Sequence, residues 1–300
     1  MTSPDIRIGT LINGNDATGS YLRQILPHGF ESFELCFGWG TDCRNWDLDR
    51  LAADIAAALD GHDAVISTVG FYGNPLLDDT DGEVARTSIA TLIDRAADFG
   101  ATCLCGFTGA LSDRSLPDNR ERFIEVWRPL AERAGERGIS IGFENCSMGG
   151  SWKTPRYNLA ICPRAWEILF EAIPLSNLGL EWEPCHQMVQ LADPMPQLRE
   201  WVSRIVHVHG KDASVHWDVV TRHGIHSGLP YAYHRSPGFG DSNWTDIIST
   251  LRSGGFKGSI DIEGWHDPVY RGELEMTGQV HGLRYLQGCR GSFVANPVEE

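Results

Sequence analysis

Ile139-Ser-Ile-Gly-Phe-Glu144 is a short apolar run that ends on a carboxylate, and it is the first of four similar runs in the second half of the chain. The other three are Leu178-Gly-Leu-Glu-Trp-Glu183, Ile205-Val-His-Val-His209 and Ser259-Ile-Asp-Ile-Glu263. Runs of this length are typical of strands in a parallel sheet, which are buried on both faces. If all four belong to one barrel, their final side chains meet at its carboxyl-terminal mouth.

Apolar runs alternate with amphipathic stretches along the whole chain, a pattern that is typical of repeated βα units. Eight strands are predicted, beginning near Ile6, Ser32, Ala64, Thr102, Ser140, Leu178, Ile205 and Ser259. Apolar residues at three- and four-residue spacing predict helices over residues 48–59, 83–99, 120–137, 163–172 and 244–253. The sequence therefore predicts an α/β fold, a single (β/α)8 TIM barrel, for which 300 residues is a usual length.

The chain shows no linker rich in Pro, Ser or Gly, so one domain over residues 1–300 is predicted. Two long connections, about 146–162 and 210–240, lack a clear helix or strand pattern. Irregular connections of this length in a compact domain are usually lids or binding loops. Both follow predicted strands that end on candidate ligands, so we expect them to border an active site.

Composition narrows the classes of partner. The chain has 40 acidic and 25 basic residues, a net charge of -15, and no basic patch, which disfavours binding to nucleic acid or to anionic membranes. The N-terminus lacks the pattern of a secretory signal, and no apolar run approaches membrane-spanning length. We expect a cytoplasmic protein with eight reduced cysteines, and a homo-oligomer is a candidate state because barrel helices often pair.

The residues at the four strand ends suit a metal. A glutamate at one strand end is more often a solvated rim residue than a ligand. Glu144, Glu183, His209 and Glu263 stand at the ends of four successive predicted strands, and barrel geometry brings such ends together. Three carboxylates and one imidazole favour Mn²⁺, Mg²⁺ or Co²⁺ over a thiolate-type zinc site.

Further stretches carry a family resemblance: Glu183-Pro-Cys-His186, Val206-His-Val-His-Gly-Lys-Asp212, Pro237-Gly-Phe-Gly-Asp-Ser-Asn-Trp244 and Gly254-Gly-Phe-Lys-Gly-Ser-Ile-Asp-Ile-Glu263. With these motifs the chain resembles the sugar phosphate isomerase/epimerase family of the xylose isomerase-like TIM barrel superfamily. That superfamily includes ketose 3-epimerases, inosose dehydratases and DNA-repair enzymes of the endonuclease IV type. The resemblance covers essentially the whole chain. It implies one divalent cation bound by Glu144, Glu183, His209 and Glu263, with Mn²⁺ first and Mg²⁺, Co²⁺ or Zn²⁺ as the other candidates.

The resemblance also implies roles for single residues. Glu144 and Glu263 would flank the substrate, one removing a proton from the carbon beside a ketone and the other returning one, while the cation stabilises the enediolate. His186 and Arg235 would contact the substrate. Independently of the resemblance, Lys211 is a candidate hydrogen-bond donor to the substrate, and Trp152, in a Gly-Gly-Ser-Trp loop, is a candidate stacking ring.

The sequence departs from the family pattern at two places. Related chains usually have Asp where this chain has Glu183, and the extra methylene moves the carboxylate by about one bond length. In Glu263-Gly-Trp-His-Asp267, related sequences place the His and acidic residues sooner after the Glu, so we expect a different pocket shape there. Within Val206-His-Val-His-Gly-Lys-Asp212 we interpret only His209 as facing the mouth, and we expect His207 to be a core or helix-facing histidine with a satisfied ring nitrogen.

These observations predict a divalent-metal-dependent isomerase or epimerase that acts on a keto-sugar through a metal-stabilised enediolate. The main alternative is a lyase or dehydratase, in which the same base and cation eliminate a β-leaving group from a 3-keto-glycoside or a keto-polyol. An endonuclease IV-like nuclease is disfavoured by the net charge and by early strand ends without histidine. A non-catalytic sugar-binding protein that kept the barrel is the remaining alternative.

Overall fold

Eight parallel strands close into a barrel in the computed structural model, which describes residues 5–264, 266–292 and 294. Around the barrel their order is β1-β10-β7-β6-β5-β4-β3-β2. Each strand begins within one residue of its predicted start, and the predicted fold class is confirmed. The strands are β1 (Arg7–Asn13), β2 (Ser32–Phe37), β3 (Val65–Phe71), β4 (Cys103–Gly106), β5 (Ser140–Glu144), β6 (Leu178–Trp182), β7 (Ile205–Gly210) and β10 (Ser259–Ile262).

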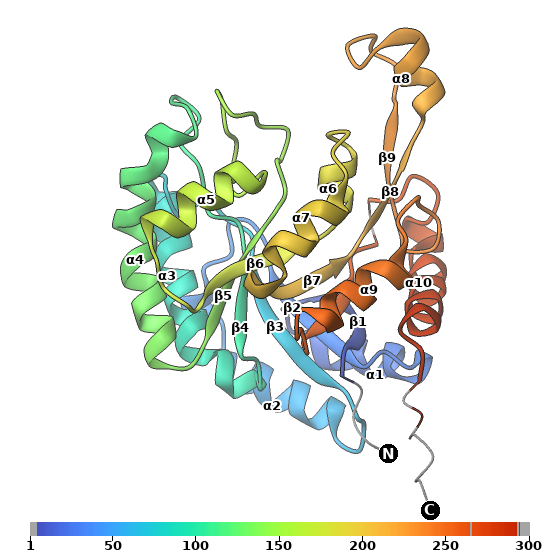
Figure 1. Ribbon diagram of the computed structural model, residues 1–300. Coiled ribbons are helices and arrows are strands. Elements are labelled where there is room, and N and C mark those ends of the chain that lie inside the picture. The colour runs from blue at the N-terminus through green and yellow to red at the C-terminus, as the bar shows by residue number, and fades with distance from the viewer. Residues whose placement is uncertain (1–4, 265, 293, 295–300) are drawn as a thin grey trace, which may run out of the picture.

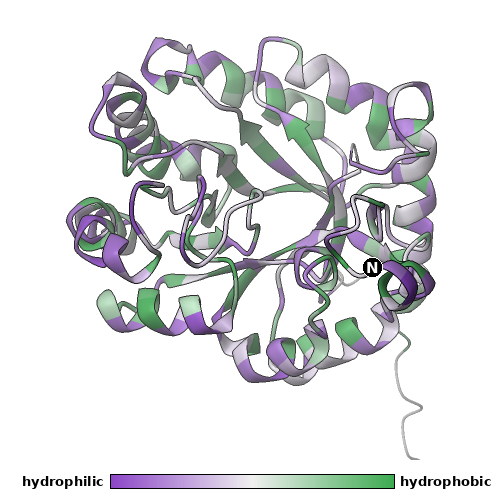
Figure 2. Cartoon of the chain, turned by 90° about the horizontal axis from the view of Figure 1, so that it is seen from above, coloured by the Kyte–Doolittle hydropathy of each residue, from purple (hydrophilic) through white to green (hydrophobic). Residues whose placement is uncertain are grey.

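Helices surround the barrel, as the views from the side and from above show (Figures 1 and 2). They are α1 (Thr18–Ile25), α2 (Leu48–Leu59), α3 (Thr80–Arg95), α4 (Arg120–Glu136), α5 (Pro163–Ala172), α6 (Cys185–Met188), α7 (Pro194–Trp201), α8 (Trp217–His223), α9 (Trp244–Ser253) and α10 (Glu275–Arg290). Short 3-10 helices are η1 (Leu26–His28), η2 (Cys43–Asn45), η3 (Ala96–Phe99), η4 (Pro117–Asn119), η5 (Val202–Arg204) and η6 (Gly272–Leu274). None of the helices in the described part of the chain is long and apolar enough to cross a bilayer.

Local signals explain the helix bounds. Helices α2, α5 and α9 have the predicted bounds, whereas α3 begins earlier than predicted because the Asp79 side chain accepts a hydrogen bond from the backbone N–H of Gly82. The last residues of the predicted 83–99 helix form η3 instead. Gly100 follows with φ of 80°, a left-handed cap that disfavours any side chain.

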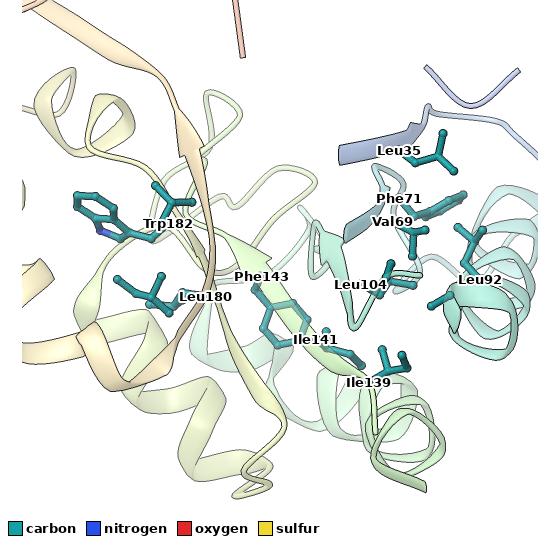
Figure 3. Packing of buried hydrophobic residues seen from close by; sticks show 14 of the residues in the cluster. Leu35, Val69, Phe71, Leu92, Leu104, Ile139, Ile141, Phe143, Leu180 and Trp182 are labelled. Atoms are coloured by element: carbon teal, nitrogen blue, oxygen red, sulfur yellow. The ribbon is translucent and has the colours of Figure 1, made fainter. Parts of the chain in front are cut away.

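The apolar core lies largely between the strands and the helices. Outward-facing side chains of neighbouring strands pack in one continuous layer that Leu92 of α3 joins (Figure 3). Phe143 of β5, for example, meets the ring of Trp127 on α4 edge to face, with centroids 4.8 Å apart. Because side chains alternate along a strand, the neighbouring positions point into the barrel, and several of these carry buried acidic or imidazole groups. Barrel interiors are usually filled by branched apolar residues, so this polar interior is a distinctive feature of the chain.

The connection after β7 is a structured arm, which corrects the expectation of an irregular loop over 210–240. Strands β8 (Asp212–Val215) and β9 (Ala232–Arg235) pair antiparallel, and α8 lies at the tip of the hairpin. The arm projects beyond the carboxyl-terminal mouth of the barrel (Figure 1). The 146–162 connection is described throughout, and it contains only an isolated bridge between Arg156 and Asn158, as expected for an irregular connection.

Gly9 on β1 permits the close approach that closes the barrel. A Cβ at this position would lie 1.9 Å from the carbonyl oxygen of Ser32 and 2.2 Å from Asp261 Oδ1. We predict that Gly9→Ala lowers the free energy of unfolding by about 1–3 kcal/mol, because backbone must move to admit the methyl group. Urea unfolding followed by circular dichroism measures this. Gly288→Ala is the matched control, since its Cβ would meet nothing within 4 Å on α10, and it should leave stability unchanged or slightly raised.

Candidate active site

The structure brings the four predicted ligands together at the barrel mouth. Glu144 ends β5, Glu183 follows β6, His209 lies in β7 and Glu263 follows β10. One ligand atom of each lies within 4.8 Å of the others, and all four side chains are buried. His209 Nδ1 is 3.3 Å from Glu263 Oε2 and 3.8 Å from Glu144 Oε1. The sequence prediction that these side chains converge therefore agrees with the geometry, while metal binding itself stays a prediction.

Unpartnered atoms in this cluster fit a cation. His209 Nδ1 and Glu263 Oε2 are buried and have no hydrogen-bond partner. Leaving a buried polar atom unpaired costs about 1–3 kcal/mol, so such atoms usually mark a missing ligand or water. Three carboxylates and an imidazole form a donor set suited to a hard or borderline divalent ion. Glu183 takes part in this cluster although related chains have Asp, because its longer side chain still places an oxygen among the other ligand atoms.

The three carboxyl groups differ in electrostatic environment. Burial raises the pKa of Glu144 above its usual value, against the pull of His186. Burial has the same effect on Glu183 and Glu263, but nearby positive charge outweighs it there. His186 and Lys211 lower the pKa of Glu183 to about 2, and Lys211 holds the pKa of Glu263 well below its usual range. Glu144 is therefore the most basic of the three.

The other ring nitrogen of His209 faces two carboxyl groups that sequence reasoning missed. His209 Nε2 lies 2.7 Å from Glu34 Oε2 and 3.1 Å from Glu181 Oε1. The Tyr72 hydroxyl lies 2.6 Å from Glu34 Oε1 and donates to it. A proton held on Nε2 by these carboxyl groups leaves Nδ1 as the nitrogen that can bind a cation. A signal for Glu34 and Glu181 was present in the sequence, since each is a carboxylate within an otherwise apolar strand.

Glu34 and Glu181 differ in proton affinity. Burial raises the pKa of Glu181 well above its usual range, and the neighbouring charge of Glu34 raises it further. Burial also disfavours the charge on Glu34, but His209 and His207 outweigh it and lower its pKa. Of the two carboxyl groups, Glu34 is therefore the more readily ionised partner of His209.

His207 also points into the barrel, where it is buried, as the expectation of a core histidine allows. Residues two apart on a strand share a face, so His207 and His209 lie on the same side of β7. His207 Nε2 is 3.3 Å from Glu34 Oε2 and 3.4 Å from Asp261 Oδ2, yet it makes no hydrogen bond. Nε2 of His207 is thus without the hydrogen bond that is expected of its ring from the sequence.

The predicted substrate-binding residues divide into two pairs. His186 and Lys211 line the cavity at the mouth, with His186 Nε2 2.6 Å from Glu183 Oε1 and Lys211 Nζ 2.8 Å from Glu263 Oε1. Arg235 lies outside the lining of this cavity and donates to Asp267 Oδ2 at 3.0 Å. Trp152 also lies outside it, with the Arg164 guanidinium 4.4 Å from its ring centroid. Substrate contact by Arg235 and by Trp152 stays a prediction.

Two further histidines line the cavity, and sequence reasoning did not single them out. His266 Nδ1 lies 3.0 Å from Glu263 Oε1, and its ring lies 5.8 Å from that of His234. Burial and the charge of Lys211 lower the pKa of His234 to about 4, so it is neutral at neutral pH. The second departure from the family pattern could have indicated His266, because it stands three residues after Glu263. Trp265, within the same departure, lies outside the described residues.

Sequence comparison identifies the family. The profile of the xylose isomerase-like TIM barrel matches residues 22–289. The chain belongs to this family. The predicted superfamily is therefore confirmed. A search of curated proteins found no match.

Three solved structures share the barrel over nearly their whole length. The 3-keto-D-glucoside 4-epimerase YcjR from E. coli superposes with a TM-score of 0.69 at 16% identity, covering 95% of this chain and 100% of that one. The probable 3-DHS dehydratase AsbF from Bacillus anthracis gives 0.66 at 16% identity, with 93% and 98% covered. The IOLI protein with a bound zinc atom gives 0.63 at 15% identity, with 95% and 96% covered. At these identities the likeness shows the fold alone.

We predict that Glu34→Gln weakens binding of Mn²⁺ by about 10- to 100-fold, because an amide orients His209 less firmly and makes it a weaker donor to the ion. Isothermal titration calorimetry of the metal-free protein measures the change. Glu136→Gln, on the exposed end of α4, is the control and should bind as the original protein does. Equal affinity of both variants would show that the contact from Glu34 does not support the ligand.

Proposed function

We propose that the protein is a divalent-metal-dependent isomerase or epimerase that acts on a keto-sugar through an enediolate. The observation that supports this most directly is the convergence of Glu144, Glu183, His209 and Glu263 in one cluster. Three of them, Glu144, His209 and Glu263, line the cavity at the mouth. One cation, with Mn²⁺ as the preferred ion, would be held by these four residues and would polarise the substrate carbonyl. A cytoplasmic location, one domain over residues 1–300 and a homo-oligomeric state belong to the same proposal.

In this proposal Glu144 removes a proton from the carbon beside the carbonyl. Its pKa is raised by burial, which makes it a better base than the neighbouring carboxylates. Glu263 returns a proton to the carbon, and because its low pKa leaves it ionised, this proton is first passed to Oε1 by the Lys211 ammonium 2.8 Å away, which regains one from solvent. His186 and Lys211 line the same cavity and would hydrogen-bond the substrate oxygens. Their proximity to the carboxylates keeps these donors close to the reacting carbon.

Elimination is the second candidate function, and the position of Lys211 favours it. Its ammonium lies 2.8 Å from Glu263 Oε1 on the cavity wall, where it could protonate an oxygen as the carbon–oxygen bond breaks. Removal of the α-proton by Glu144 and expulsion of a protonated β-oxygen would turn a 3-keto-glycoside into an enone and a free alcohol. The same residues therefore support a lyase or dehydratase with a substrate that carries a leaving group.

Incubation in deuterated water distinguishes the two reactions. We expect a ketohexose or a 3-keto-glucoside, supplied with the Mn²⁺-loaded protein, to acquire solvent deuterium while the sugar stays intact. An enone or a released alcohol, detected by mass spectrometry, would favour elimination instead. Glu144→Gln should lower either rate by about 100- to 10,000-fold, and Glu136→Gln should leave it unchanged. No reaction with any ion, together with undiminished sugar binding by Glu144→Gln, would indicate a non-catalytic binding protein.

Metal removal tests the cation directly. We expect elemental analysis of the purified protein to find about one divalent ion per chain, and chelation followed by dialysis to abolish the reaction until Mn²⁺ is restored. His209→Ala should lose the ion, because it removes the nitrogen ligand. Full activity of protein that contains no divalent ion would contradict the proposed function.

A further inference from the structure

The cavity lining is divided between two arcs of the barrel. The candidate ligands come from β5, β6, β7 and β10, which are consecutive in the closed sheet. The opposite arc comprises β1, β2, β3 and β4 with the segments that follow them. Its described lining residues include no charged side chain, and its apolar part, here named the apolar arc, consists of Leu11, Cys36, Trp39, Tyr72 and Phe107.

The polar atoms of the apolar arc are already engaged or neutral. The Tyr72 hydroxyl donates to Glu34 beneath the cavity floor, so the tyrosine contributes its ring rather than a donor. Its ring meets Phe107 edge to face, with centroids 5.2 Å apart. Burial raises the pKa of Cys36 well above its usual range, which keeps the thiol neutral. Sugar hydroxyls placed against the rings of Tyr72 and Phe107 would lose hydrogen bonds to water without replacement.

The rim above this surface carries an exposed indole. Trp39 is 46% exposed although it is a large apolar residue. Its ring packs edge to face with Tyr157 of the 146–162 connection, with centroids 4.9 Å apart. Trp39 also lines the cavity, and aromatic rings prefer such offset or edge-to-face contacts with further rings. The 146–162 connection thereby takes part in the rim, in keeping with its expected position beside the site.

The size of the cavity points to an occupant larger than a single sugar ring. Its volume is about 620 Å³. Cavities of roughly 300 to 1,000 Å³ hold drug-sized ligands, which combine an apolar body with a few polar groups. Here the polar groups gather at the metal-ligand cluster and the apolar surface lies across from them. An occupant that matches both has a sugar at one end and an aromatic group at the other.

We propose that the substrate is a keto-glycoside whose sugar lies at the metal-ligand cluster and whose aromatic aglycone lies against the apolar arc. This inference rests on the proposed function, since it names the substrate class of the same site. It holds for both reactions, because the aglycone stays attached in an epimerisation and departs in an elimination. The apolar arc then sets specificity, while the candidate ligands on the opposite arc carry out the proton transfers.

Phenyl and methyl 3-keto-β-glucosides, as substrates of the Mn²⁺-loaded protein, test the proposal. Their kinetic constants are compared, and turnover is measured as deuterium uptake or as alcohol release. We expect KM to be lower for the phenyl compound by about tenfold or more, because the added contact is made before the reaction, whereas kcat of an elimination also rises with the better leaving group. Trp39→Ala should bring the ratio of the two KM values toward one. Trp217→Ala is the matched control, since this indole is also exposed but lies on the arm outside the cavity lining, and it should preserve the ratio.

Binding of the unreactive phenyl and methyl β-glucosides, measured by calorimetry, tests the apolar arc separately from turnover. Tighter binding of the phenyl glucoside, lost in Trp39→Ala and in Phe107→Ala, supports the inference. Equal dissociation constants for the two glucosides overturn it, whatever the turnover. A preserved preference for the phenyl glucoside without any deuterium uptake or alcohol release would instead reject the proposed function and leave an aryl-glycoside-binding site.

Discussion

His209 joins two groups of buried carboxyl side chains, one on each side of its ring. Nδ1 faces Glu144 and Glu263 at the mouth, and Nε2 faces Glu34 and Glu181 in the barrel interior. A charge buried in protein is tolerated only when it is paired, protonated or bound to an ion. In the described residues, compensation comes from buried histidines, from Lys211 and from the raised pKa of Glu181, which favours its neutral form. Positive charge at the mouth, supplied by a divalent ion, would complete the balance.

The need to compensate buried charge also explains which residues occupy the inward-facing positions of the strands. Small residues such as Gly9 leave room for the carboxylate of Asp261 and its contact with Ser32. Tyr72 supplies a hydroxyl to Glu34, and the rest of its ring becomes part of the cavity floor. The polar interior and the substrate cavity are therefore built from the same side chains. A change beneath the floor is expected to alter the ligand His209 and the shape of the pocket together.

The mouth combines this acidic half with an apolar half from the first four strands. In this closed barrel four consecutive strands lie across the axis from the other four. Residues from the first and second halves of the sequence therefore line opposite sides of the mouth. The connections after the strands are divided between the two halves of the mouth in the same way. Trp39 and the 146–162 connection meet above the apolar half, and the arm formed by β8, β9 and α8 rises beside the acidic half. Separate surfaces for the sugar and for its substituent follow from this arrangement.

Local sequence determined the strand starts, the bounds of three helices and the four residues at the strand ends, because apolar runs, three- to four-residue periodicity and glycine caps act over short distances. It did not reveal that residues 210–240 form a hairpin arm, since the pairing of Asp212 with Arg235 joins positions far apart in the chain. Nor did it place Glu34 and Glu181 beside His209, or direct His207 inward. Only closure of the barrel brings atoms from β2, β6 and β7 to within hydrogen-bonding distance. The identity of the chemical groups was thus encoded locally, whereas their partners, charges and shared cavity were decided by the tertiary structure, because electrostatic and packing energies depend on distances in space.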